Sequence, residues 1–212
     1  MQSKFPQKIA DNVIMYSADP ILYEVKNFLS SDECDAFIQA GRDNVKPSKV
    51  ITKSKGKSVF HASRVSQNCF LAHDTNELIQ EVSKRISILV QMPIRNAESY
   101  QLVYYGVGGE YKPHFDGFNY EKEKDWFENG GQRILTVIAY LNDVEEGGGT
   151  SFPEIGHNLS AKKGNIAVFH NTLPCMQSPH PKIHPSSLHG GMPVIKGEKW
   201  MVNLWFRENI IK

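Results

Sequence analysis

The chain has 212 residues, a length typical of one globular domain and sufficient to bury a sizeable core. Its formal net charge is +1 and 22% of its residues are charged, so its composition predicts no general attraction to nucleic acid or membranes. No apolar run approaches the roughly 18 residues of a membrane span, and residues 1–20 lack the apolar stretch of a secretory signal. We therefore expect a cytoplasmic or otherwise intracellular protein.

The N-terminal part combines one short strand with a helix. Ile21–Val25 is apolar enough to predict a strand. Ser30 and Glu33 have the spacing of a capping box, so a helix should begin there and carry Phe37 on its buried face.

A second helix is predicted from about Thr75 to the residue before Pro93. Its apolar face is expected to consist of Leu78, Val82, Ile86 and Leu89. The intervening residues 46–68 are rich in Ser and Lys, and we expect a loop region there with room for one edge strand.

After Glu98 the sequence changes to short aromatic and β-branched segments separated by glycine-rich turns. The expected strands are Gln101–Val107, Ile134–Leu141, Asn165–His170 and Trp200–Phe206. Their regular spacing predicts a sandwich or jelly roll. Residues 117–132 should form a mobile loop that could act as a lid.

His114 and Asp116 are the first candidate metal ligands. In an extended segment side chains alternate, so a His-x-Asp pair places both groups on one face, where they can bind one ion. A second histidine would complete the two-His, one-carboxylate face of non-haem Fe(II) oxygenases. A surface His followed by a turn Asp is the alternative interpretation of this short motif.

Five downstream histidines could supply the third ligand: His157, His170, His180, His184 and His189. His189 is favoured because Gly190 and Gly191 give the backbone room beside it. It also lies ten residues before Lys199, a separation that a hairpin would bring into one cavity. Lys199 could pair with the far carboxylate of a dicarboxylate cosubstrate, or it could be a hydrated lysine at a hairpin end.

The sequence resembles the prolyl 4-hydroxylase family of Fe(II)- and 2-oxoglutarate-dependent dioxygenases from about Pro20 to Glu208. The matching segments fall in family order: Phe28–Cys34, Glu98–Tyr105, Tyr111–Asp116, Gly130–Arg133, Tyr140–Pro153, Ser187–Val194 and Lys196–Trp200. The resemblance implies an α+β, mainly β fold, the double-stranded β-helix or jelly roll, with supporting N-terminal helices. It further implies one catalytic domain over 1–212, divided into a helical support region (1–97) and a jelly-roll core (98–212).

The resemblance also implies roles for individual residues. The iron ligands would be His114, Asp116 and His189, and Lys199 would hold the far carboxylate of 2-oxoglutarate. The remaining roles are cosubstrate binding by Tyr105 and Thr150, and contact with the peptide substrate by Tyr111, Arg133 and Trp205.

The activity implied by the resemblance is hydroxylation of peptidyl proline to 4-hydroxyproline, as in procollagen-proline 4-dioxygenases. It would use Fe(II), 2-oxoglutarate and O₂, release succinate, and take L-ascorbate as reductant. The partner would be a proline-containing peptide or protein, with no nucleic acid or membrane. Two alternatives stay open: an oxygenase acting on another residue or a small molecule, and a non-catalytic β-sandwich binding module.

Overall fold

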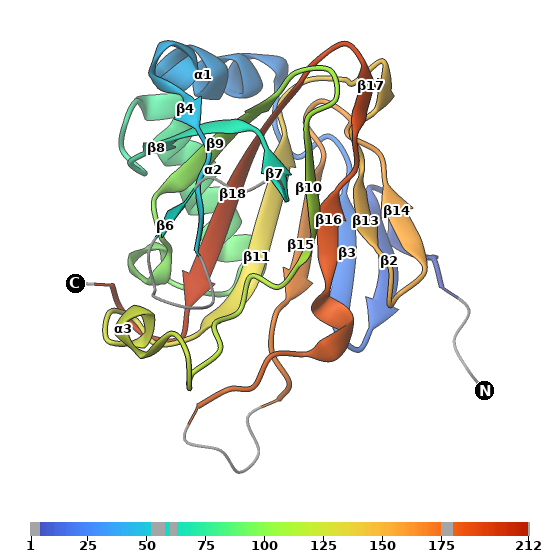
Figure 1. Cartoon of the computed structure of the whole chain (residues 1–212). Helices are drawn as coiled ribbons and strands as arrows, with labels where there is room; N and C mark the ends of the chain where they lie inside the picture. Colours follow the sequence, from blue (N-terminus) through green and yellow to red (C-terminus); the bar gives the residue numbers. More distant parts are fainter. Residues whose placement is uncertain (1–4, 52–57, 60–62, 175–179, 212) are drawn as a thin grey trace.

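The fold is described from a computed structural model, and the described residues are 5–51, 58–59, 63–174 and 180–211. Two antiparallel sheets lie face to face, with two helices on the outer side of the larger one (Figure 1). The larger sheet has nine strands in the order β1 (Gln7–Ala10), β2 (Val13–Ala18), β3 (Ile21–Val25), β15 (Ile166–His170), β11 (Arg133–Tyr140), β18 (Lys199–Arg207), β9 (Tyr100–Tyr105), β8 (Gln67–Leu71) and β4 (Lys46–Pro47).

The smaller sheet faces the central strands of the larger one. Its five strands, in order, are β14 (His157–Leu159), β13 (Thr150–Phe152), β16 (His189–Gly191), β10 (Glu110–His114) and β7 (Arg64–Val65). Two further pairs are β12 (Glu146–Gly147) with β17 (Val194–Lys196), and β5 (Val50–Ile51) with β6 (Ser58–Val59). This arrangement confirms the predicted mainly β, jelly-roll fold.

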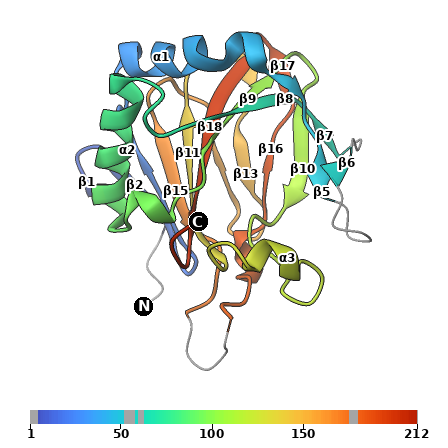
Figure 2. The ribbon, with the colours of Figure 1, turned by 90° about the vertical axis from the view of Figure 1, so that its left-hand side faces the viewer.

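Helix α1 (Ser31–Gly41) begins as predicted. The Ser30 hydroxyl accepts from the Glu33 backbone N–H at 3.2 Å, and the Ser30 N–H donates to the Glu33 carboxylate at 2.8 Å. Both halves of the capping box are therefore formed. Together with α2 (Glu77–Val90), α1 covers the outer face of the larger sheet (Figure 2).

The predicted apolar face of α2 is wrong by one residue at its N-terminal end. Leu78 is 43% exposed, whereas Ile79 is completely buried and continues to Val82 and Ile86. The helix is capped by Asn76, whose side chain accepts from the Ile79 backbone N–H at 2.9 Å. The buried face of the helix consists of Ile79, Val82, Ser83 and Ile86, so Ile79 rather than Leu78 points at the sheet.

The region before residue 97 is less helical than predicted. Strands β1, β2, β3, β4 and β8 all join the nine-stranded sheet, so the support region contributes strands as well as helices. In residues 46–68 the expected single edge strand is also an underestimate, because β8 begins at Gln67 and pairs with both β4 and β9. The lysine and serine content of that segment predicts a loop, but pairing with β4 and β9 keeps the backbone of β8 extended.

Alternation along the central strands separates a hydrophobic core from an internal cavity. On β18 the even-numbered residues Trp200 to Phe206 pack with the helices, while Lys199, Met201, Asn203 and Trp205 line the cavity. On β11, Thr136, Ile138 and Tyr140 lie on the cavity side of the strand. A register shift between Arg133 and Leu135 lets Arg133 face the cavity as well.

The predicted lid, residues 117–132, contains the short helix α3 (Lys124–Phe127). Arg207 donates to the backbone carbonyls of Trp126 and Asn129, and the Gln132 side chain bonds both backbone groups of Phe118. These contacts attach the loop to the end of β18, beside the cavity. Its function as a lid stays a prediction. Three 3₁₀ helices, Arg42–Asn44, Ile94–Asn96 and Pro185–Ser187, complete the fold.

Candidate active site

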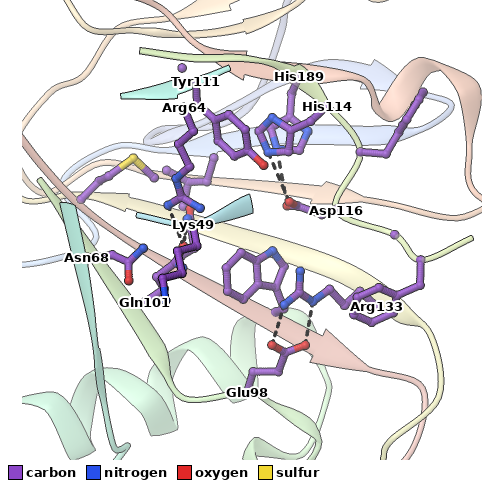
Figure 3. Close-up of a pocket in the computed structure, with 18 of the residues that line it drawn as sticks. Lys49, Arg64, Asn68, Glu98, Gln101, Tyr111, His114, Asp116, Arg133 and His189 are labelled. Carbon is purple, nitrogen blue, oxygen red and sulfur yellow. Dashed lines mark hydrogen bonds and ion pairs between the residues drawn. The ribbon is translucent and has the colours of Figure 1, made fainter. Parts of the chain in front are cut away.

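Strand pairing brings the three predicted metal ligands together. His114 on β10 lies directly opposite His189 on β16 in the antiparallel register, and Asp116 follows two residues after β10 ends. The Nε2 atoms of His114 and His189 lie 3.5 and 3.4 Å from the two oxygens of Asp116. One ligand atom from each residue lies within 4.8 Å of the others (Figure 3). Ligands at right angles, each about 2.1 Å from an ion, are about 3 Å apart, so the three groups fit one metal.

Gly190 permits the close approach of these two strands. A Cβ atom at Gly190 would lie 2.9 Å from the Tyr111 carbonyl and 3.0 Å from the Pro113 nitrogen. Both contacts are with backbone, which cannot move aside without shifting β10. Glycine at this position therefore keeps His189 beside His114.

Both imidazoles are oriented by backbone carbonyls. His114 Nδ1 donates to the Lys112 carbonyl at 2.9 Å, and His189 Nδ1 donates to the Ser187 carbonyl at 2.9 Å. A carbonyl can only accept, so each Nδ1 carries the hydrogen and each Nε2 presents a lone pair to Asp116. This is the tautomer that a metal-binding histidine needs.

The charge states also suit metal binding. Burial lowers the pKa of His189 to about 4, which outweighs the attraction of Asp116, so this imidazole is neutral at pH 7. Burial alone would raise the pKa of Asp116, but the neighbouring His189 and His114, with a contribution from Arg133, hold it below its usual range. A neutral imidazole and an ionised carboxylate are the forms that bind a metal. The donor set of two imidazoles and one carboxylate is that of non-haem iron sites.

Thr136 and Asn171 support the carboxylate, and the sequence reasoning missed both. The Thr136 hydroxyl donates to Asp116 Oδ2 at 2.8 Å and accepts from the Asn171 amide at 2.9 Å. Both residues are completely buried. The sequence contains a signal for Thr136, because this residue interrupts the apolar strand Ile134–Leu141 and a buried hydroxyl needs a hydrogen-bond partner.

We expect Thr136→Val to weaken Fe(II) binding about 10- to 100-fold, the effect of removing an outer partner of a metal ligand. The substitution keeps the shape of the side chain but leaves Asp116 without its hydroxyl donor. Thr136→Ser retains that donor and should bind iron nearly as well as the parent. Titration with Fe(II) or Co(II) under anaerobic conditions measures the affinity, and equal affinity of the valine and serine variants would contradict this role.

Lys199 lies in the same cavity and is 1% exposed. Its ammonium donates to the Gly149 carbonyl at 3.5 Å and lies over the rings of Tyr105 and Tyr140, 5.3 and 5.6 Å from their centres. Burial lowers its pKa to about 7. No carboxylate of the described residues lies within ion-pair distance of it. A buried cation without a counter-ion is suited to an anionic ligand.

Thr150 and Tyr105 lie beside this lysine, as predicted. Tyr140 donates its hydroxyl to Thr150 Oγ1 at 2.8 Å, which fixes the Thr150 side chain in the cavity wall. Tyr105 is opposite Lys199 in the β9–β18 register. The pocket around the ammonium thus contains hydroxyl groups, which can donate hydrogen bonds to a carboxylate, and aromatic rings that form its walls.

Arg133 forms the opposite wall of the cavity with an unforeseen partner, Glu98. Two guanidinium nitrogens of Arg133 donate to the two Glu98 oxygens at 2.7 Å each (Figure 3). Arg207 donates to the same carboxylate at 2.8 Å. The Arg133 guanidinium also stacks 3.9 Å from the centre of the Trp205 ring. Burial alone would raise the pKa of Glu98, but the two arginines hold it below its usual range.

We expect Glu98→Gln to destabilise the protein by about 3 kcal/mol, the lower end of the cost of breaking a buried ion pair. The change leaves the Arg133 and Arg207 guanidinium groups without their shared charge partner. Urea unfolding measures the loss. Glu81→Gln, which removes an exposed pair with Lys84, is the control and should change stability by less than about 1 kcal/mol. A similar small loss for both variants would contradict the structural role of Glu98.

All nine predicted site residues line one cavity of about 1130 Å³: Tyr105, Tyr111, His114, Asp116, Arg133, Thr150, His189, Lys199 and Trp205. The other candidate histidines lie elsewhere in contacts of their own. His157 is edge-on to Tyr16, His180 stacks on Tyr120, and His184 contacts Asp19 at 3.0 Å. His170 ends β15, where burial lowers its pKa.

Comparisons with known proteins agree with this site. A family model described as the 2OG-Fe(II) oxygenase superfamily matches residues 100–207. The chain is 37% identical over 209 residues to the probable prolyl 4-hydroxylase 10 of Arabidopsis thaliana, covering 92% of this chain and 71% of the relative. It is 35% identical over 219 residues to prolyl 4-hydroxylase 5 of the same plant, covering 94% of this chain and 72% of the relative.

A solved structure gives the same result. The viral collagen prolyl hydroxylase of Paramecium Bursaria Chlorella virus-1, determined as a complex with 2OG, is 26% identical. It superposes with a TM-score of 0.68 and covers 88% of this chain and 95% of the viral chain. The fold and the His-Asp-His site thus define a 2-oxoglutarate- and Fe(II)-dependent oxygenase. Within that superfamily, the chain belongs to the prolyl 4-hydroxylase family.

Proposed function

We propose that this protein hydroxylates proline residues of peptides to 4-hydroxyproline and converts 2-oxoglutarate and O₂ to succinate and CO₂. The observation that carries the proposal is one cavity that contains the His114–Asp116–His189 cluster and the buried cation Lys199. Membership of the prolyl 4-hydroxylase family gives the substrate class. The alternative of a non-catalytic binding module has no observation in its favour.

In this mechanism each residue binds or positions a reactant. His114, Asp116 and His189 would hold Fe(II), which when bound supplies the activation of O₂ that is coupled to 2-oxoglutarate decarboxylation. Lys199 would pair with the far carboxylate of 2-oxoglutarate. The rings of Phe152 and Phe169 pack around His189 and keep bulk water from that side of the site.

The peptide would lie against Tyr111, Arg133 and Trp205. Tyr111 stacks on His114 with ring centres 3.6 Å apart, so a side chain held against Tyr111 is next to the metal ligands. Trp205 lines the cavity, and its indole N–H is buried and has no acceptor among the described residues. A shift of this side chain on peptide binding would let the N–H donate to a carbonyl of the peptide backbone. We further propose that the whole chain is one catalytic domain, because both halves supply strands to the same sheet.

Mass spectrometry of proline-containing peptides tests the proposal, after incubation with the protein, Fe(II), 2-oxoglutarate and ascorbate in air. We expect a gain of one oxygen on proline, matched by succinate and absent without 2-oxoglutarate. Fragmentation must place the oxygen on C4 of the ring. Succinate formation with oxidation of another residue or of a small molecule would replace the proline assignment. Absence of both products in iron-loaded protein would overturn the enzyme assignment.

A further inference from the structure

One arm of the cavity is lined by basic side chains that the proposed chemistry does not use. We call Lys46, Lys49 and Arg64 the basic arm; all three line the same cavity as the metal ligands. Figure 3 shows Lys49 and Arg64 on the side of the cavity away from Arg133. Tyr111 separates Arg64 from the metal site. The Arg64 guanidinium lies 4.7 Å from the centre of the Tyr111 ring, and Tyr111 stacks on His114.

The larger sheet forms the floor of this arm. Asn203 on β18 pairs with Gln101 on β9, and Gln101 pairs with Phe70 on β8. The adjacent row of paired residues runs from Val103 through Asn68 to Lys46 on the edge strand β4. The floor therefore extends continuously from the strand that carries Lys199 and Trp205 to the lysine at the sheet edge.

Positive charge exceeds negative charge along the cavity wall. Its described lining includes six Lys or Arg side chains but only three carboxylates. Glu98 is already bonded by Arg133, Asp116 belongs to the metal site, and Glu123 is adjacent in sequence to Lys122. Lys199 is assigned to the cosubstrate. The other three cations of the described lining are Lys46, Lys49 and Arg64, the basic arm.

Nearby groups of the protein leave the charge of Arg64 uncompensated. Arg64 donates to Ser66 Oγ at 2.9 Å and to Gln101 Oε1 at 3.2 Å, and both acceptors are neutral. The sequence itself contains no Asp or Glu from residue 44 to residue 73, although this stretch has five lysines and one arginine in a chain of net charge +1. Of these six basic residues, the described residues Lys46, Lys49 and Arg64 line the cavity.

We propose that the basic arm binds carboxylate side chains of the peptide substrate, so that the preferred target is a proline close to Asp or Glu residues. This inference rests on the proposed prolyl hydroxylation and specifies the substrate class for the same site. The side chain of Phe70, which is 61% exposed on the floor of the arm, would support the peptide residues between the proline and the acidic group.

Sheet geometry gives the expected number of residues between the target proline and the acidic side chain. From β18 to β4 the floor crosses three strand spacings, which is about 14 Å, and an extended peptide advances about 3.3 Å per residue. An acidic side chain about three to six residues from the target proline would therefore reach the arm.

An acidic peptide fits the arm better than a nucleic acid. A nucleic-acid site usually neutralises several phosphates along a basic stripe, whereas this arm offers three cations at one side of a cavity. The unpaired Trp205 indole N–H in the same cavity suits a peptide carbonyl.

The test is a set of peptides with one proline in a neutral host sequence. Glu is placed singly at each position up to six residues on either side of the proline, and Gln at the same position is the isosteric control. The measured quantities are kcat/KM from succinate release, and binding of the labelled peptides by fluorescence anisotropy. We expect Glu to exceed Gln about two- to fivefold at one or two positions, the size of an exposed ion pair. The advantage should shrink in 0.3 M salt, where the screening length is a few ångströms.

Variants assign the effect to the basic arm. The double variant Lys46→Gln, Lys49→Gln keeps only Arg64 of the arm, so its preference for Glu should be reduced while it still hydroxylates the Gln peptides. The double variant Lys46→Glu, Lys49→Glu changes the charge of the arm from +3 to −1 and should reverse the preference, so that a Lys peptide exceeds a Glu peptide. Lys84→Gln, on the helix at the far side of the sheet, is the matched control and should keep the preference for Glu.

The outcomes separate this inference from the proposed function. Equal hydroxylation of Glu, Gln and Lys peptides by the parent protein would overturn the acidic-substrate inference and leave prolyl hydroxylation intact. An unchanged Glu preference in the Lys46→Gln, Lys49→Gln variant would also overturn it. Binding of a 15-nucleotide oligothymidylate that an excess of Glu peptide does not displace would assign the arm to nucleic acid instead. If no peptide is hydroxylated or bound, both the proposed function and the inference fail.

Discussion

Replacement of Asp116 by alanine should abolish turnover and reduce Fe(II) affinity by more than about a hundredfold, beyond the effect of removing an outer-shell partner. Asp116 supplies the sole carboxylate of the His-Asp-His cluster and lies within 3.5 Å of both imidazoles. Without it, two neutral imidazoles remain, and they cannot balance the charge of a divalent ion in a buried site. Succinate release and anaerobic metal titration measure the two effects.

The control for Asp116→Ala is its thermal stability without metal. Asp116 is buried beside His189, and its removal also deletes the hydroxyl contact from Thr136. Circular dichroism must show a folded protein before the loss of turnover is assigned to the metal. Full turnover in an iron-loaded Asp116→Ala protein would show that the carboxylate is not a ligand.

Lys199→Met should raise the KM for 2-oxoglutarate about a hundredfold or more while leaving iron affinity nearly unchanged. Loss of one partner from a buried charge pair costs about 3 kcal/mol, which corresponds to that factor. Methionine fills a similar volume, so the aromatic walls formed by Tyr105 and Tyr140 should stay in place. Steady-state kinetics with varied 2-oxoglutarate measure KM, and a KM within threefold of the parent would remove Lys199 from the cosubstrate site.

The same lysine should make 2-oxoglutarate binding pH-dependent. Its pKa is about 7 without ligand, and a bound carboxylate raises the pKa because it favours the charged form. Below pH 7 the lysine is already protonated, whereas above pH 7 binding must take up a proton. Affinity should therefore fall about tenfold per pH unit above pH 7, until the pKa of the complex is reached. Calorimetric titration from pH 6 to 9 measures this slope, which should be absent in Lys199→Met.

The stability of the ligand-free protein should also depend on pH through Lys199. The pKa of Lys199 is about 7 in the folded protein and about 10.4 in an unfolded chain. Between these values the unfolded chain binds a proton that the folded protein does not, so this group makes the ligand-free protein more stable as pH rises. The ligand-free Lys199→Met variant lacks this burial penalty and should be more stable than the parent at pH 6. Thermal unfolding at pH 6 and pH 9 measures the difference.

The sequence allowed two of the three metal ligands to be predicted because their signal is local. His114 and Asp116 are two residues apart, and the alternation of an extended segment is enough to place them together. His189 and Lys199 required the family resemblance, since nothing in their ten-residue separation excludes the other histidines. Strand pairing, which the sequence does not state, is what sets His189 opposite His114.

The supporting residues could not be placed in the same way. Thr136 and Asn171 lie in separate segments and meet only when β11 and β15 are paired, and Glu98, which precedes β9, meets Arg133 of β11 only in the assembled sheet. Their polarity in apolar surroundings marks them as bonded, but it does not name the partner. Leu78 and Ile79 show the same limit for the core, because either of two adjacent apolar residues can face the sheet and only the packing of the helix decides which one does.

The two faces of β18 also limit which sequence changes this enzyme family can accept in that strand. Because Lys199, Met201, Asn203 and Trp205 alternate with residues of the hydrophobic core, loss of one residue from this strand would exchange the two sets. Apolar side chains would then fill the cavity, and a lysine would enter the core. New substrate preferences in such a protein should therefore arise by point substitution within β18, whereas insertions and deletions should be confined to connecting loops such as residues 117–132.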